Sequence, residues 1–126
     1  MTALDAKRIF LIASENSIQT EFLKNSIQNT VSNSTIFTAK DGAEAMAKLK
    51  NVPPNAIVMD RNLPKISGDK IMETILETKT LDNLSIIVIG ELPDQEIFLD
   101  DLVTGRLQFL SNPNNKEDLN HALVRA

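Results

Sequence analysis

An uninterrupted apolar run, Ala56–Met59, ends abruptly in the carboxylate of Asp60, and a loop that contains Pro64 and reaches Gly68 follows it. A short apolar run without polar alternation is typical of a strand that is buried on both faces. Such strands belong to parallel sheets that helices cover on both sides. Asp60 is therefore predicted at the carboxyl end of a central strand. In open parallel sheets, the crevice at these strand ends is the usual place for ligands or chemistry.

Apolar runs and amphipathic stretches alternate along the whole chain. The apolar runs predict strands at Arg8–Ala13, Thr35–Thr38, Ala56–Met59, Leu84–Ile89 and Leu107–Leu110. Apolar residues at helical spacing predict a first helix capped by Ser14 or Asn16, a second from Asp41–Gly42 to Pro53–Pro54, and others from Asp69 to near Thr80, from Pro93 through Val103, and from Asn115 to Arg125. Because the connections are short and no repeat is visible, we predict one α/β domain over residues 1–126, with a doubly wound parallel sheet.

The composition argues against several classes of function. A net charge of −4 and a pI near 4.9 argue against direct binding of nucleic acid. No cysteine is present, so disulfides and thiolate metal sites are excluded. The apolar run Ile9–Ala13 is too short for a membrane span or a signal-peptide core, so the cytoplasm is the expected compartment. Neither a glycine-rich phosphate loop nor a Ser–His–Asp spacing is visible, and we expect no independent enzymatic activity.

The residues in and after the predicted strands carry a family resemblance. In order, they are Ile9–Ile12 after a charged residue, Asp60 with Leu63–Pro64 and Ser67–Gly68, Ile86–Gly90, and Phe109–Pro113. Their joint spacing resembles the receiver domain of bacterial response regulators, the CheY-like family, over essentially the whole chain. The resemblance implies a flavodoxin-like (βα)5 fold with strand order 2-1-3-4-5. It also implies two-component phosphorelay signalling, in which a histidine kinase phosphorylates the aspartate that matches Asp60.

Four positions of the pocket that this resemblance implies are changed. The family's Mg²⁺-binding acidic pair falls on Ala13 and Ser14, its hydroxyl on Gly90, and its phosphate-binding lysine on Asn112. These residues supply neither the carboxylates that Mg²⁺ prefers nor a positive charge for a phosphoryl group. The losses leave Asp60 as an isolated carboxylate. We therefore predict a degenerate pocket with weak or absent Mg²⁺ binding, in which hydrogen bonds from Ser14, Asn112 or loop amides hold Asp60.

A partial rescue of the metal site stays open at this point. Glu15 and Glu91 each lie one residue beyond a lost position. A local shift that turned either carboxylate inward would restore a weak site, although strand alternation points neighbouring side chains in opposite directions.

The resemblance also implies surfaces for protein partners. In the helix predicted from Pro93 through Val103, apolar residues span well over half of the helix circumference, which is more than one buried face requires. In the family, the fourth helix, fifth strand and fifth helix form the output and dimerisation surface. Phe98 and Leu99 are therefore possible partner contacts, with burial under the loops as the alternative. A histidine kinase, an output domain or a second copy would be the partner.

Two expectations concern the segment around the fifth strand. Phe109 matches the switch aromatic of the family, and without a hydroxyl at Gly90 we expect no switch motion. The family's lysine–proline bond after this strand is typically cis, so we expect a cis Asn112–Pro113 bond.

Three functions remain open from the sequence. The preferred hypothesis is a pseudo-receiver that acts by phosphorylation-independent contact between proteins. The first alternative is a working receiver that is phosphorylated at Asp60. The second is a flavodoxin-like binder of a small molecule, in the space between Ala13, Gly90 and Asn112.

Overall fold

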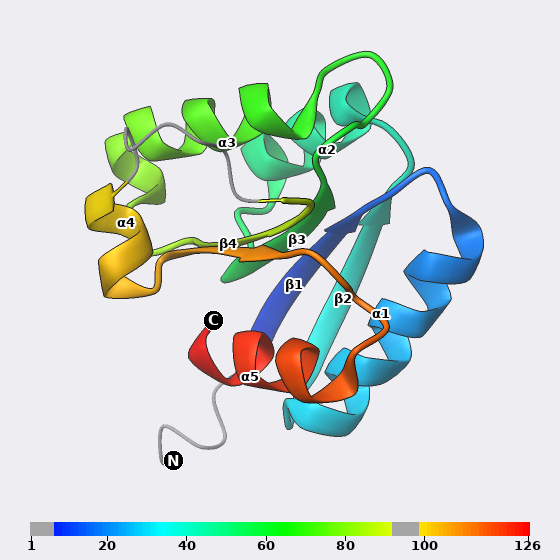
Figure 1. The fold of residues 1–126 in the computed structure, drawn as a ribbon. Coiled ribbons are helices and arrows are strands. Elements are labelled where there is room, and N and C mark those ends of the chain that lie inside the picture. Colours follow the sequence, from blue (N-terminus) through cyan, green and yellow to red (C-terminus); the bar gives the residue numbers. More distant parts are fainter. Residues whose placement is uncertain (1–6, 92–98) are drawn as a thin grey trace.

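A parallel five-stranded sheet with strand order β2-β1-β3-β4-β5 forms the centre of the protein. The computed structural model describes residues 7–91 and 99–126. The strands are β1 (Arg8–Ala13), β2 (Ser34–Ala39), β3 (Ala56–Asp60), β4 (Ser85–Ile89) and β5 (Leu107–Leu110). The predicted fold class and strand order are therefore confirmed (Figure 1).

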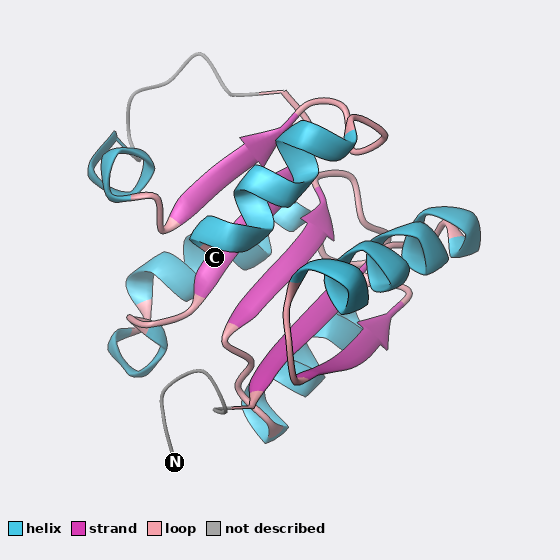
Figure 2. Cartoon of the chain, turned by 90° about the horizontal axis from the view of Figure 1, so that it is seen from below, coloured by secondary structure: helices cyan, strands magenta, loops and turns pink. Residues whose placement is uncertain are grey.

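Helices cover both faces of the sheet (Figure 1). They are α1 (Ser17–Thr30), α2 (Gly42–Asn51), α3 (Gly68–Glu77), α4 (Leu99–Thr104) and α5 (Lys116–Arg125). Helices α1 and α5 pack on one face, where α5 crosses in front of the sheet in Figure 2. Helices α2 and α3 pack on the other face, and α4 contributes to the same core. The alternation of short parallel strands with helices thus produces two cores, one on each side of the sheet.

Polar residues with short side chains start the helices, as the sequence predicts. Asn16 caps α1, because its side-chain oxygen accepts hydrogen bonds from the backbone of Ile18 and Gln19, each at 3.0 Å. This settles the choice between Ser14 and Asn16. Asp41 caps α2 in the same way through the backbone of Glu44, at 2.8 Å.

Some element boundaries differ from the prediction. Strand β2 is longer than Thr35–Thr38, because its pairing with β1 continues from Ser34 to Ala39. A short 3₁₀ turn, Lys79–Leu81, follows α3 and was not predicted. The predicted fourth helix falls partly on residues 93–98, so Phe98 and the side chain of Leu99 lie outside the described residues. Within the described ranges, no helix has the length and apolar character needed to span a membrane.

Candidate functional site

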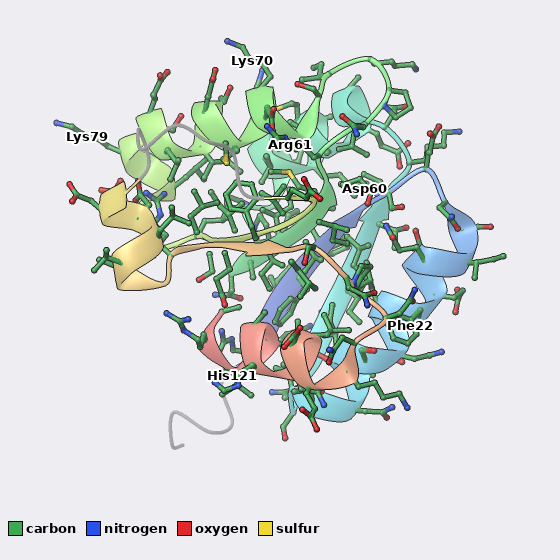
Figure 3. The ribbon with its side chains drawn as sticks, in the orientation of Figure 1. Phe22, Asp60, Arg61, Lys70, Lys79 and His121 are labelled. Carbon is green, nitrogen blue, oxygen red and sulfur yellow. The ribbon has the colours of Figure 1, made fainter. Side chains whose placement is uncertain are left out.

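Asp60 is the last residue of β3, the middle strand of the sheet. Its Cα lies opposite Ile89 of β4, and β1 ends beside it at Ala13. Three strand ends therefore meet around a half-buried carboxylate (Figure 3). Asp60 thus lies at the carboxyl end of a central strand, as the sequence predicts.

Both oxygens of the Asp60 carboxylate accept hydrogen bonds from neutral side chains. The Ser14 hydroxyl donates to Oδ2 at 2.8 Å. The Gln19 amide donates from Nε2 to Oδ1 at 2.6 Å. Ser14 is one of the partners that the sequence suggests, whereas Gln19 was not predicted. We call Ser14 and Gln19 the neutral clamp.

The neutral clamp is itself held by the start of α1. Gln19 Nε2 lies 3.1 Å from the hydroxyl of Ser14, which is only 4% exposed. The backbone amide of Asn16 also donates to this hydroxyl, at 3.1 Å. Because Asn16 caps the helix, the first turn of α1 places Gln19 over Asp60. Hydrogen bonds at the start of α1 thus hold Ser14 and Gln19 in place without a ligand.

The residues around Asp60 do not fit Mg²⁺. Ala13 presents a fully buried methyl group, and Ser14 uses its hydroxyl proton on Asp60. Gln19 faces the carboxylate with an N–H donor, whereas Mg²⁺ takes oxygen ligands. Glu15 and Glu91 are exposed. Across the described ranges, no group of three or more His, Cys, Asp or Glu residues is arranged to hold a metal ion.

Arg61 occupies the side of the site where the family hydroxyl is expected. Its side chain lies so close to Gly90 that a Cβ at position 90 would be 3.2 Å from Arg61 Cβ and 3.3 Å from Cδ. Gly90 has φ +154°, a backbone conformation that residues with side chains rarely adopt. The space that a small molecule would need beside Gly90 therefore holds the aliphatic part of Arg61. Sequence reasoning missed this residue.

Asn112 belongs to the turn before α5. Its side-chain oxygen accepts a hydrogen bond from Asn114 N at 3.1 Å, and its carbonyl accepts one from Asn115 N at 3.2 Å. The predicted cis Asn112–Pro113 bond is wrong, since the described residues contain no cis peptide bond. The trans form of an X–Pro bond is favoured by about 0.5–1 kcal/mol. Here the Asn112 side chain closes the turn without a cis bond.

The loop after Asp60 is fastened to the start of α2. Gly42 N donates to the Pro64 carbonyl at 2.9 Å, and Lys65 Nζ lies 3.4 Å from Asp41 Oδ2. The pKa of Asp41 is lowered, chiefly because its carboxylate accepts the Glu44 backbone N–H and further because Lys65 is near, although burial acts in the opposite direction. We call the contacts of Asp41 and Gly42 with the loop the α2 latch.

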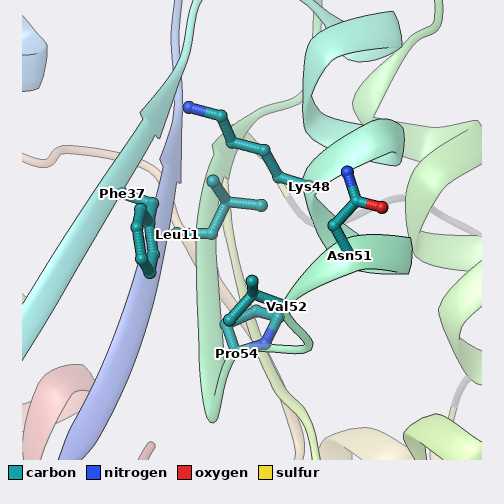
Figure 4. A pocket seen from close by; sticks show the side chains of 6 residues that line it. All are labelled: Leu11, Phe37, Lys48, Asn51, Val52 and Pro54. Carbon is teal, nitrogen blue, oxygen red and sulfur yellow. The ribbon is translucent and has the colours of Figure 1, made fainter.

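The remaining features lie away from Asp60. Phe109 is partly buried and packs against the core under α2 and α3. Val103 on α4 and Val124 on α5 are each 73% exposed. A cavity of about 180 Å³ opens between β2 and α2, lined by Leu11, Phe37, Lys48, Asn51, Val52 and Pro54 (Figure 4). It includes no residue of the predicted pocket.

An Asp60→Asn variant tests whether Asp60 is an isolated carboxylate or is repelled by other carboxylates close to it. Here the carboxylate accepts two hydrogen bonds from neutral side chains and, within the described residues, belongs to no cluster of three or more acidic or metal-binding side chains, so we expect the free energy of unfolding to fall by about 1–2 kcal/mol. Urea unfolding measures the change, and the exposed Asp82, replaced by asparagine, is the control. A gain in stability is the result expected where several carboxylates repel one another, and it would contradict the neutral clamp.

Comparison with known proteins points to one family. A family model described as response regulator receiver domain matches residues 10–124. Hybrid signal transduction histidine kinase D of Dictyostelium discoideum is 26% identical over 113 residues, which are 90% of this chain and 7% of that protein. A protein-glutamate methylesterase/protein-glutamine glutaminase of Nitrosospira multiformis is 30% identical over 105 residues, which are 82% of this chain and 29% of that protein. The matching segment is therefore a small part of these relatives.

Solved structures share the fold. The signal receiver domain of a histidine kinase from Syntrophus aciditrophicus has a TM-score of 0.76 and 22% identity, covering 94% of this chain and 88% of that one. A chemotaxis response regulator of Vibrio cholerae has a TM-score of 0.75 and 22% identity, covering 95% and 98%. The receiver domain of a sensor histidine kinase from Pseudomonas aeruginosa, with a magnesium ion in its active site cleft, has a TM-score of 0.73 and 20% identity, covering 95% and 97%.

Proposed function

The chain belongs to the family of response regulator receiver domains, and on this premise we propose that it is a pseudo-receiver that signals by contact between proteins, without phosphorylation of Asp60. The observation that carries the proposal is the neutral clamp. Both carboxylate oxygens of Asp60 already accept hydrogen bonds, from Ser14 and from Gln19. Each carboxylate oxygen thus has a hydrogen-bond donor from the chain itself.

Phosphoryl transfer to a carboxylate makes demands that this site does not meet. The transferring group carries negative charge, so metal ions and cationic side chains normally stabilise it. Here Ser14 and Gln19 offer neutral donors, and in the part of the chain that the structure describes Asp60 belongs to no group of three or more possible metal ligands. Asn112 has no charge and is engaged in its own turn. Attack by Asp60 on a phosphodonor would therefore lack its electrostatic support.

A protein partner fits the surfaces that the structure presents. Val103 and Val124 expose apolar side chains on α4 and α5, whose neighbouring strand is β5. Each is a single exposed valine, and what favours a partner here is that α4, β5 and α5 are the elements that the family uses for output and dimerisation. We propose a histidine kinase, an output domain or a second copy of the chain as the partner.

A working phosphoacceptor is the second candidate, since Asp60 remains half-exposed at the carboxyl end of β3. A small phosphodonor could reach a carboxylate in this position. The neutral clamp would then have to open to admit the cation and the donor.

Incubation with acetyl phosphate and Mg²⁺, followed by intact-mass measurement, tests the two candidates. We expect no added phosphoryl mass on the wild-type protein, because Ala13 and Ser14 stand where the family has its Mg²⁺-binding acidic pair. The guanidinium of Arg61, the cation next to Asp60 in the chain, is already bound to Asp69 and to the Glu91 carbonyl. A receiver domain that keeps the acidic pair, the hydroxyl and the lysine is the positive control under the same conditions. An added phosphoryl mass that disappears in Asp60→Asn would overturn the proposal.

A further inference from the structure

The side chain of Arg61 contacts two segments that follow different strands. Its Nε donates to Asp69 Oδ1 at 2.9 Å, on the first turn of α3. Its Nη1 donates to the backbone carbonyl of Glu91 at 2.9 Å, just after β4. A guanidinium can do this because its N–H groups point in different directions within one rigid plane.

The backbone of Arg61 is fixed on both sides. Its N–H donates to the Ile89 carbonyl at 3.2 Å, and its own carbonyl accepts from Gly68 N at 2.9 Å. The side chain therefore starts from a point that two neighbouring segments hold in place. A side chain with a fixed origin loses less freedom when it makes its contacts, so those contacts constrain the structure more effectively.

Gly90 is what allows Arg61 to cross this position. A Cβ there would lie 3.2 Å and 3.3 Å from two carbon atoms of Arg61, which is tighter than most such contacts, so the Arg61 side chain would have to shift by a few tenths of an ångström. The φ of +154° would in addition strain any residue that has a side chain. The glycine at the family's hydroxyl position thus leaves the space that the side chain of Arg61, the residue after Asp60, occupies.

We propose that Arg61 is a positioning residue that tethers Glu91, the residue two positions after β4, to α3 and holds it in place without a phosphoryl group. This inference rests on the proposed function and deepens it, because it names what fixes the structure next to a site that is not phosphorylated. The carbonyl of Glu91 is held by a permanent cation of the chain itself. A protein partner would therefore meet the Glu91 backbone in the same position with or without a phosphoryl group.

Hydrogen exchange of the Gly90 amide reports on the tether, since this amide donates to the Leu110 carbonyl at 3.0 Å. Arg61→Lys keeps a positive charge beside Asp69, but one ammonium cannot also reach the Glu91 carbonyl in another direction. Arg61→Met removes both contacts. We expect exchange at Gly90 to become about tenfold faster or more in both variants, as for the loss of a charge-assisted hydrogen bond.

Arg106→Lys is the matched control. Arg106 also donates to two backbone carbonyls, of Leu84 at 3.2 Å and Leu81 at 2.7 Å, and it pairs with Asp101. Its replacement is expected to change exchange near those residues and to leave Gly90 unaffected. This control separates a local tether from general loss of stability.

The exchange experiment contains no phosphodonor, so its outcome is independent of phosphorylation of Asp60. Faster exchange confined to the end of β4 supports the tether. Unchanged exchange at Gly90, or equal acceleration across the molecule in the Arg61 variants, overturns it. A phosphoryl adduct on Asp60 in the mass experiment would instead defeat the proposed function and leave the exchange result standing.

Discussion

A Gly42→Ala variant is expected to lose about 2–4 kcal/mol of unfolding free energy, from the cost of overpacking and the loss of a hydrogen bond. A Cβ at position 42 would lie 1.8 Å from the Ile66 carbonyl oxygen and 2.6 Å from its carbonyl carbon. Both atoms belong to the backbone, so the loop after Asp60 must move away. The hydrogen bond from Gly42 N to the Pro64 carbonyl, now 2.9 Å, would break with it.

The expected loss of stability is opposite in sign to the effect of helix propensity. Gly42 is the first residue of α2, where helix propensity alone favours alanine over glycine by up to about 1 kcal/mol. Thermal and urea unfolding measure the change, with the exposed Ala47, replaced by glycine in the same helix, as the control for propensity. A Gly42→Ala protein that equals or exceeds the wild type in stability would show that the α2 latch does not constrain the loop.

A Ser14→Asp variant is expected to make the stability of the protein depend on Mg²⁺. The new carboxylate would replace the hydroxyl that now lies 2.8 Å from Asp60 Oδ2, in a position that is 4% exposed. Two close carboxylates repel each other, so we expect a loss of about 2–3 kcal/mol without divalent cations. Mg²⁺ at a hundred times its dissociation constant would return about 2.7 kcal/mol.

Melting temperatures in EDTA and in Mg²⁺ measure this dependence. Ser14→Asn, which resembles aspartate in shape but is neutral, is the matched control and should not respond to Mg²⁺. The wild type should not respond either, because the neutral clamp leaves no ligand set for the cation. A wild-type melting temperature that rises in Mg²⁺ would contradict the assignment of a degenerate pocket.

The fold and part of the pocket were predictable because they depend on local patterns. The apolar run before Asp60 specifies a buried strand whatever surrounds it, and the alternation of strands and helices specifies the parallel sheet. The changes at Ala13, Gly90 and Asn112 were visible as residue types. The side chains that lie at the site in place of the lost groups, Gln19 and Arg61, were not predicted.

Gln19 was missed because its direction depends on where α1 begins. Ser14 and Asn16 are both suitable caps, and each residue added at the start of a helix turns the following side chains by about 100°. Arg61 was missed for another reason. Its path across Gly90 depends on a tertiary contact, and the sequence shows that glycine only as a lost hydroxyl. The predicted cis bond was wrong because a family geometry was carried over to a turn that the Asn112 side chain closes with the trans isomer.

The amide of Gln19 has a consequence for how such a module can be controlled. A metal ion arrives from solution and its occupancy follows its concentration, whereas this amide is delivered by α1 in every folded molecule. If the proposed function holds, folding alone sets how many copies are ready to bind a partner. On the proposed function, the cell would adjust the signal through synthesis and turnover of the polypeptide, with dosage taking the place of chemical modification.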